Sequence, residues 1–345
     1  YKSVWEKAYQ DAIPISGTFE LTPRCNFNCR MCYVHLDEKQ IPWYGREMTG
    51  KEWIQTAHAA KEAGTVWLCV TGGEPLVHPD FPEIWKELTQ MGFFITLQTN
   101  ASLIQGDMAD LLAEYPPRAV KITLYGSNDE VYEQVCRVKD GFSRVDRGIR
   151  TLRELKIPVQ LISTVIRQNL EDVPRMAYYA YQNRLPWMGT GGVKATVRNP
   201  DSQARMVRVE EKLEQQKKEE IRYRLEKAPV NIERKPCTYC KDYRLGYWVT
   251  WNGMMRFCSF MNEPDLSVRD RAFSQAWQEL IQYEEALDWP EECKTCKVQK
   301  ACMKCAGTLA AECGSPHRVT EEFCNKVKKY YDDEKGEWDI WEDIM

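Results

Sequence analysis

The chain has 345 residues, of which 43% are hydrophobic and 28% charged, an ordinary composition for a globular protein. Its net charge of -4 and pI near 5.8 argue against a nucleic-acid-binding protein, which usually carries a basic surplus. No apolar stretch approaches the roughly 18 residues needed to span a bilayer, and the charged N-terminus lacks the apolar core of a signal peptide. We therefore expect a cytoplasmic protein of one large and one smaller domain, with no membrane and no nucleic-acid partner.

Strands and helices are predicted to alternate from Ile15 to Asn199. Several strand-like runs are apolar on both faces, as in a covered parallel sheet; the runs are 16–22, 66–71, 93–99, 120–125, 159–166 and 193–197. Helical patterns lie between them, at 49–63, 80–91, 105–114, 143–156 and 170–183, and Thr49-Gly50-Lys51-Glu52 is typical of a capping box that opens the first. Right-handed crossovers then predict an α/β fold, a partial (β/α)6 TIM-like barrel.

The second half of the chain changes character. Residues 202–227 are charge-dense and predict a solvated linking helix, and residues 248–250 and 255–258 predict a hairpin around Asn252-Gly253. We expect bound metal, more than an apolar core, to hold the cysteine-rich region. The predicted segments are a lead-in (1–14), the barrel (15–200), a linking helix (201–236), a cysteine-rich domain (237–326) and an acidic, aromatic tail (327–345).

Of the fourteen cysteines, three fall within residues 25–32 and nine within residues 237–324. Without a secretion signal, such clustering indicates metal binding more than disulfides. Cys25, Cys29 and Cys32 share one short loop after the first strand. Three thiolates can bind three irons of a [4Fe–4S] cube and leave the fourth iron open to another ligand. The alternative is a zinc site that His35 would complete.

A second motif, Gly72-Gly73-Glu74-Pro75, follows the second strand. The two glycines would let the backbone approach a ligand closely. Glu74 would offer a charged acceptor at the carboxyl end of the strand, where active sites of α/β barrels form. A simple tight turn is the alternative.

Together the two motifs resemble the radical S-adenosylmethionine (SAM) family. CNFNCRMC matches the family's CxxxCxxC, and GGEP begins 40 residues after Cys32. The resemblance implies that SAM chelates the open iron and is cleaved, after one-electron reduction, to a 5′-deoxyadenosyl radical that abstracts hydrogen from a substrate. It further implies SAM contacts by Met31, Gly72, Gly73, Glu74, Asn100, Thr123 and Ser163. For Thr123 and Ser163, a hydroxyl satisfied within the core is the alternative.

The C-terminal cysteines resemble the SPASM extension of that family. Twelve residues separate Cys240 from Gly253, and four separate Gly253 from Cys258. The series Cys293-x2-Cys296-x5-Cys302-x2-Cys305 follows, and its last spacing is one residue shorter than the family's. The resemblance implies two auxiliary [4Fe–4S] clusters, three clusters in all, with ligands Cys237, Cys240, Cys258 and Cys305, and Cys293, Cys296, Cys302 and Cys324. Cys313 could replace Cys324, and two zinc knuckles are the alternative.

Two further cysteines lie in the barrel. Cys69 is predicted to be a core residue. Cys136, after the fourth strand, could face the barrel mouth and return a hydrogen atom to a substrate radical, with core packing as the alternative.

The resemblance predicts an enzyme that modifies a peptide or protein by crosslinking, epimerisation or oxidation. Only about 14 residues precede the barrel, which argues against a leader-binding domain there. The alternatives are a small-molecule (sugar or alcohol) dehydrogenase or epimerase, and a non-enzymatic zinc-binding adaptor. An electron donor such as flavodoxin or ferredoxin is the expected partner.

Overall fold

The computed structural model describes residues 2–196, 198–209, 214–227, 233–302, 304–333 and 335–340. The α-helices are α1 (Lys2–Asp11), α2 (Gly50–Glu62), α3 (Phe81–Gln90), α4 (Asp107–Glu114), α5 (Asp129–Cys136), α6 (Gly141–Glu154), α7 (Val173–Gln182), α8 (Glu214–Glu226), α9 (Phe273–Ala286), α10 (Glu291–Lys294), α11 (Ala306–Cys313) and α12 (Glu321–Lys328). Short 3-10 helices are η1 (Ile41–Trp43), η2 (Pro75–Val77), η3 (Leu170–Asp172) and η5 (Pro236–Tyr239). The strands are β1 (Ser16–Glu20), β2 (Trp67–Thr71), β3 (Phe94–Thr99), β4 (Ala119–Thr123), β5 (Val159–Thr164), β6 (Trp187–Thr190), β7 (Gly246–Val249), β8 (Met254–Arg256), β9 (Leu266–Ser267), β10 (Tyr331–Asp332) and β11 (Glu337–Trp338).

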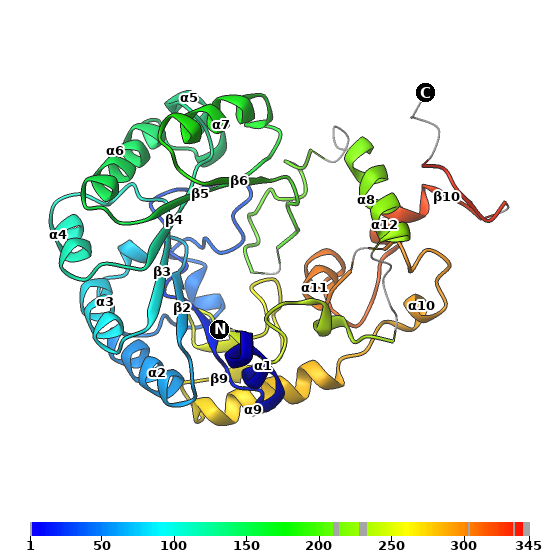
Figure 1. Cartoon of the computed structure of the whole chain (residues 1–345), viewed down its shortest axis with the longest axis horizontal. Helices are drawn as coiled ribbons and strands as arrows, with labels where there is room; N and C mark the ends of the chain where they lie inside the picture. The colour runs from blue at the N-terminus through cyan, green and yellow to red at the C-terminus, as the bar shows by residue number, and fades with distance from the viewer. Residues whose placement is uncertain are drawn as a thin grey trace.

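A curved sheet with strand order β6-β5-β4-β3-β2-β1-β7-β8-β9 forms the centre of the molecule. The strands from β1 to β6 are parallel, and helices α2 to α7 cover their outer face (Figure 1). The sheet runs from β6 through β9 without pairing its two ends, so the barrel is partial. This arrangement confirms the predicted fold class.

The sixth strand lies earlier in the chain than predicted. Trp187 of β6 pairs with Leu161 of β5, whereas residues 193–196 form no strand and residue 197 lies outside the described residues. Three of the four β6 residues are exposed, and one of these is Gly189. This edge strand therefore lacks the apolar pattern that identified the others. The charged helix is also shorter than predicted: residues 202–209 form a turn flanked by irregular backbone, 210–213 lie outside the described residues, and α8 begins at Glu214.

The cysteine-rich region continues the barrel sheet. β7 runs parallel to β1, with Ser16 opposite Gly246, and then turns back into β8. This hairpin confirms the prediction around Asn252-Gly253, and Gly253 adopts the φ of +85° that its turn requires. Val249 and Met255, both 0% exposed, belong to the same apolar core as the barrel strands. Residues after 237 are therefore joined to the barrel by both a sheet and a core. None of the described helices is long and apolar enough to cross a membrane.

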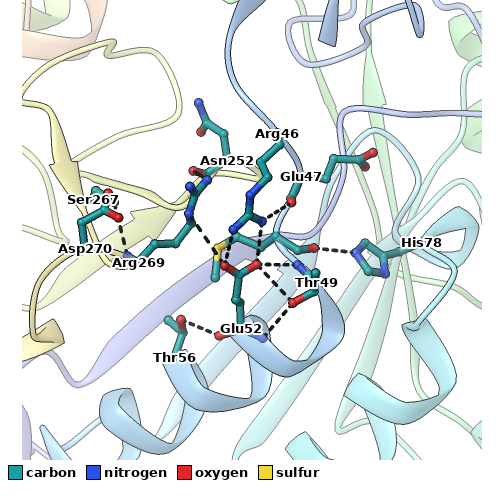
Figure 2. A network of polar contacts seen from close by, with 11 residues as sticks. Arg46, Glu47, Thr49, Glu52, Thr56, His78, Asn252, Ser267, Arg269 and Asp270 are labelled. Atoms are coloured by element: carbon teal, nitrogen blue, oxygen red, sulfur yellow. Dashed lines mark hydrogen bonds and ion pairs between the residues drawn. The ribbon is translucent and has the colours of Figure 1, made fainter. Parts of the chain in front are cut away.

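A polar network fixes α2 to the C-terminal strands (Figure 2). The Thr49 amide donates to the Glu52 carboxylate over 2.8 Å, and the Glu52 amide donates to the Thr49 hydroxyl over 3.3 Å, which confirms the capping box. The Arg46 guanidinium donates twice to the same carboxylate, over 2.6 and 2.8 Å, and lowers the pKa of Glu52 to about 2. Arg269, just beyond β9, lies 3.8 Å from it. One carboxylate thus joins a helix cap, a barrel loop and the C-terminal region.

We predict that Glu52→Ala lowers the free energy of unfolding by on the order of 1 kcal/mol, because it removes the reciprocal cap and leaves Arg46 without its partner. Urea unfolding followed by circular dichroism measures the change. Glu62→Ala, at the exposed end of the same helix, is the matched control. Equal unfolding midpoints for the two variants would contradict the assigned role.

Candidate active site

The cysteine triplet lies on the loop that follows β1, at the carboxyl end of the parallel strands. The end of α5 holds this loop in place. The Asn28 amide donates to the Cys136 carbonyl over 3.1 Å, and the Arg30 amide donates to the Val135 carbonyl over 3.0 Å. Backbone pairing therefore positions the loop independently of any bound group.

The three thiols lie at one end of a cavity and are partly buried. Backbone amides of Phe27 and His35 donate to the sulfurs of Cys25 and Cys32, each over 3.3 Å. Burial and the charge of Cys29 raise the pKa of Cys25, and burial raises the pKa of Cys32 to about 11. The thiols are thus protonated in the absence of a cation, whereas a bound metal favours the thiolates and relieves their mutual repulsion.

The donor set fits a cluster better than a zinc ion. His35, the candidate fourth zinc ligand, places its Nε2 3.6 Å from an Asp37 carboxylate oxygen. Within the described ranges, no three His, Cys, Asp or Glu side chains converge closely enough to hold one metal ion. Zinc requires its ligands at a single centre, whereas each thiolate of a [4Fe–4S] cluster binds its own iron.

The cavity beside the triplet has a volume of about 410 Å³, which is typical of small-molecule sites. Five residues predicted from sequence line it: Met31, Gly72, Gly73, Asn100 and Thr123. It is also lined by residues that sequence reasoning missed, namely Gln98, Tyr125, Thr164, Thr190, Lys194 and Phe260. All of these except Phe260 lie at or just beyond the carboxyl ends of barrel strands, and that position is the signal that could have identified them.

The two glycines allow the end of β2 to pack against the loop that carries the triplet. A Cβ atom on Gly73 would lie 2.3 Å from the Arg24 carbonyl oxygen, and one on Gly72 would lie 2.7 Å from that of Thr22. The Gly73 amide donates to the same Thr22 oxygen over 2.7 Å. No other residue fits at either position unless the loop moves.

The Glu74 carboxylate does not reach the cavity, contrary to expectation. It is 0% exposed and accepts hydrogen bonds from the Thr99 hydroxyl (2.7 Å), the Asn100 amide (2.7 Å) and the Leu76 amide (3.1 Å). Burial raises the pKa of Glu74 to about 7. This carboxylate holds the end of β3 and η2 together, and its contact to SAM stays a prediction.

The hydroxyl predicted on β5 belongs to the core. Ser163 is 0% exposed, donates to the Leu124 carbonyl over 2.5 Å and accepts from the Trp187 indole over 2.8 Å. Its neighbour Thr164 lines the cavity instead, because successive side chains of a strand face opposite sides. Thr123 does line the cavity, as predicted.

The Asn100 side chain lines the cavity and also supports the triplet loop. Its amide nitrogen donates to the Asn26 oxygen over 2.9 Å, and its own oxygen accepts from the Ser102 hydroxyl over 2.6 Å. Most of its hydrogen-bonding capacity is thus used within the chain.

Cys136 lies behind the triplet and not at the barrel mouth. It is 0% exposed and belongs to the apolar core. A hydrogen bond with the Cys136 thiol, together with burial, raises the pKa of Cys29. The structure thus places Cys136 in the core beside a triplet thiol, the alternative that the sequence also offered, and its role as a hydrogen donor stays a prediction.

The C-terminal cysteines fall into two groups. Burial and the charges of Glu284, Cys305, Cys240 and Cys258 raise the pKa of the Cys237 thiol, so these cysteines lie within electrostatic range of Cys237. A cavity of about 200 Å³, backed by β1 and β7, lies against Cys240 and Cys258. The group has both the thiols and the adjoining space that a cluster needs.

The second group lies among the C-terminal helices. Burial and the charges of Cys293, Cys296 and Cys324 raise the pKa of Cys302 to about 11, while the Lys304 charge opposes the rise. Cys313 lies at the end of α11, where its sulfur is 3.8 Å from the Thr320 hydroxyl. The charge of Cys313 in turn acts on Cys324, and the assignment of ligands within this group stays a prediction.

Comparisons with known proteins agree with this geometry. Residues 19–180 match the Radical SAM superfamily. An AdoMet-dependent heme synthase of Methanosarcina barkeri is 24% identical over 338 residues, covering 89% of this chain and 95% of that protein. A PqqA peptide cyclase of Bradyrhizobium diazoefficiens is 27% identical over 164 residues, covering 47% of this chain and 42% of that protein. This chain therefore spans less than half the length of the second relative.

A solved structure shares the fold. SuiB of Streptococcus suis bound to S-adenosylmethionine overlays with a TM-score of 0.66 and 16% sequence identity, covering 91% of this chain and 77% of SuiB. At this identity the likeness is one of fold. It extends beyond the barrel into the cysteine-rich region, because the overlay covers nearly the whole chain.

We predict that Gly73→Ala displaces the triplet loop and lowers the free energy of unfolding by about 1–3 kcal/mol, since its new methyl group would overlap the Arg24 carbonyl. Thermal unfolding and iron content after anaerobic reconstitution measure the two effects. Gly192→Ala lines the same cavity but would make only an ordinary 3.6 Å contact, with the Thr190 hydroxyl. A Gly73 variant as stable and as rich in iron as this control would refute the packing argument.

Proposed function

Since residues 19–180 match the Radical SAM superfamily, we propose that Cys25, Cys29 and Cys32 bind a [4Fe–4S] cluster and that SAM occupies the adjoining cavity. One observation carries the proposal: three neighbouring thiols open onto a cavity whose described lining contains no fourth thiol and no imidazole. Such a set leaves one iron free for an outside ligand. When bound, the cluster supplies the electron that cleaves SAM into methionine and a 5′-deoxyadenosyl radical.

The protein's own residues bind and orient these groups. Gly72 and Gly73 present backbone beside the triplet, and Met31 presents an apolar surface there. Thr123 offers a hydroxyl from the carboxyl end of β4. The loop itself is fixed by α5 and by Asn100. Preformed placement of this kind limits the motion of reacting groups and the access of water.

We further propose two auxiliary [4Fe–4S] clusters, one in each C-terminal cysteine group. Their ligands are Cys237, Cys240, Cys258 and Cys305 for the first, and Cys293, Cys296, Cys302 and Cys324 for the second. Auxiliary clusters suit an oxidative reaction, because they accept or relay the electron that remains after hydrogen abstraction. A flavodoxin or ferredoxin would supply the first electron.

The proposed substrate is a peptide or protein, modified by crosslinking, epimerisation or oxidation. Support comes from the PqqA peptide cyclases among the relatives and from SuiB, whose fold this chain shares and which has been solved with its precursor peptide SuiA. Both observations concern other proteins, so the proposed substrate class is tested by adding candidate substrates to this protein.

A tetrapyrrole is the second candidate. The alignment with the heme synthase covers 89% of this chain, whereas that with the peptide cyclase covers 47%. The two candidates separate in one experiment. Reduced, reconstituted protein with SAM is mixed with iron coproporphyrin III or with a peptide library, and 5′-deoxyadenosine and product masses are measured. Stimulation together with a mass change in one class identifies that class and excludes the other.

We predict that Cys29→Ala abolishes 5′-deoxyadenosine formation and lowers the iron content from about twelve to about eight atoms per chain, since only one of the three clusters loses a ligand. Iron, sulfide and zinc analysis of protein purified without oxygen measures the content. Cys69→Ala, on β2 and outside all three groups, is the control and should keep full iron and SAM cleavage. Retained cleavage by the Cys29 variant would exclude the proposed catalytic cluster.

We predict that Cys324→Ser loses about four irons, whereas Cys313→Ser keeps the full content, because Cys324 is the fourth ligand in the proposed set. Iron content and the electron paramagnetic resonance signals of the reduced clusters measure this. The reverse pattern would assign Cys313 as the fourth ligand.

A further inference from the structure

One cation faces the cavity. Among the described residues that line it, Lys194 is the only Lys or Arg. Its ammonium lies 5.0 Å from the centre of the Phe260 ring, and that ring lies 5.4 Å from the ring of Tyr33, the residue after the triplet. Lys194 therefore occupies the end of the cavity where the triplet loop meets the loop after β8.

The chain fixes the backbone around Lys194 but gives its side chain no acidic partner within the described ranges. The Ala195 amide donates to Glu312 of α11 over 2.9 Å, and the Thr196 hydroxyl donates to the Tyr33 carbonyl over 3.2 Å. The nearby Arg198, by contrast, forms an ion pair with Glu20 at 2.5 Å. An ammonium that lies over an aromatic ring, on a residue that lines a cavity, is suited to bind an anion from outside.

We propose that Lys194 binds a carboxylate of the substrate and so restricts the enzyme to acidic substrates. This inference rests on the proposed function, because it places the substrate between the SAM site and the first auxiliary group. Two sources share the chemistry: an Asp or Glu side chain of a peptide, and the carboxylate of a small molecule such as a tetrapyrrole. An ammonium–carboxylate hydrogen bond in a partly buried site favours the charged ligand about tenfold over its neutral analogue.

The positive charge of Lys194 could have two other roles, and each predicts a different experimental result. The ammonium could serve the carboxylate of SAM, in which case its loss weakens SAM binding. It could also serve the first auxiliary group: burial raises the pKa of the Cys258 thiol, and the Lys194 charge opposes part of that rise. In that case its loss shifts the reduction potential of the auxiliary cluster.

The test uses reconstituted protein and two probe pairs that differ in charge. The pairs are iron coproporphyrin III with its tetramethyl ester, and an acetylated Asp-containing peptide with its Asn counterpart. Binding is measured by fluorescence quenching for the wild type, Lys194→Met, Lys194→Arg and the exposed control Lys51→Met. SAM affinity and cluster potentials are measured on the same samples.

We expect the wild type to prefer the acid of one pair about tenfold, Lys194→Met to lose that preference, and the Arg and control variants to keep it. The pair that responds identifies the source of the carboxylate. Equal binding of acid and neutral probes by the wild type overturns the proposal, as does weakened SAM binding or a shifted cluster potential in Lys194→Met. Failure of the proposed function is distinct, since protein without iron or SAM cleavage reveals it before any probe is added.

Discussion

The close approach of two backbones governs this site. The end of β2 packs directly on the chain that enters the triplet loop, and only glycine at positions 72 and 73 permits the contact. Hydrogen bonds from Gly73 to Thr22 and from Glu74 to Arg24, over 2.7 and 2.8 Å, then fix the loop against the strand. This contact, together with the hydrogen bonds from α5, sets where the thiols lie relative to β2.

Glu74 extends the same constraint to the next strand. Its buried carboxylate joins β2 to β3 and the Asn100 amide, and Asn100 in turn holds Asn26 within the triplet loop. This buried carboxyl group therefore links the motif to the triplet loop. A buried carboxylate with three donors is stable where an unpartnered one would be costly.

Sequence patterns predicted the barrel well because its strands are apolar on buried faces and are separated by amphipathic helices. They missed β6, whose side chains are exposed at the sheet edge. The sequence patterns also selected Ser163 instead of Thr164. Neighbouring residues of a strand face opposite sides of the sheet, and two adjacent hydroxyl residues do not reveal which one faces the cavity. Lys194 and Phe260 are far apart in the sequence and come together only in the folded chain. Local pattern thus identified the thiols, while the cavity walls depend on packing between distant segments.

The pairing of β1 with both β2 and β7 has a consequence for synthesis of the chain. β1 is made first, yet its second neighbour begins at Gly246. Until the ribosome has released that residue, one edge of the nascent barrel exposes unpaired backbone groups beside an apolar core. Such edges invite pairing with other chains. The barrel sheet can therefore be completed only after residue 246 has been made.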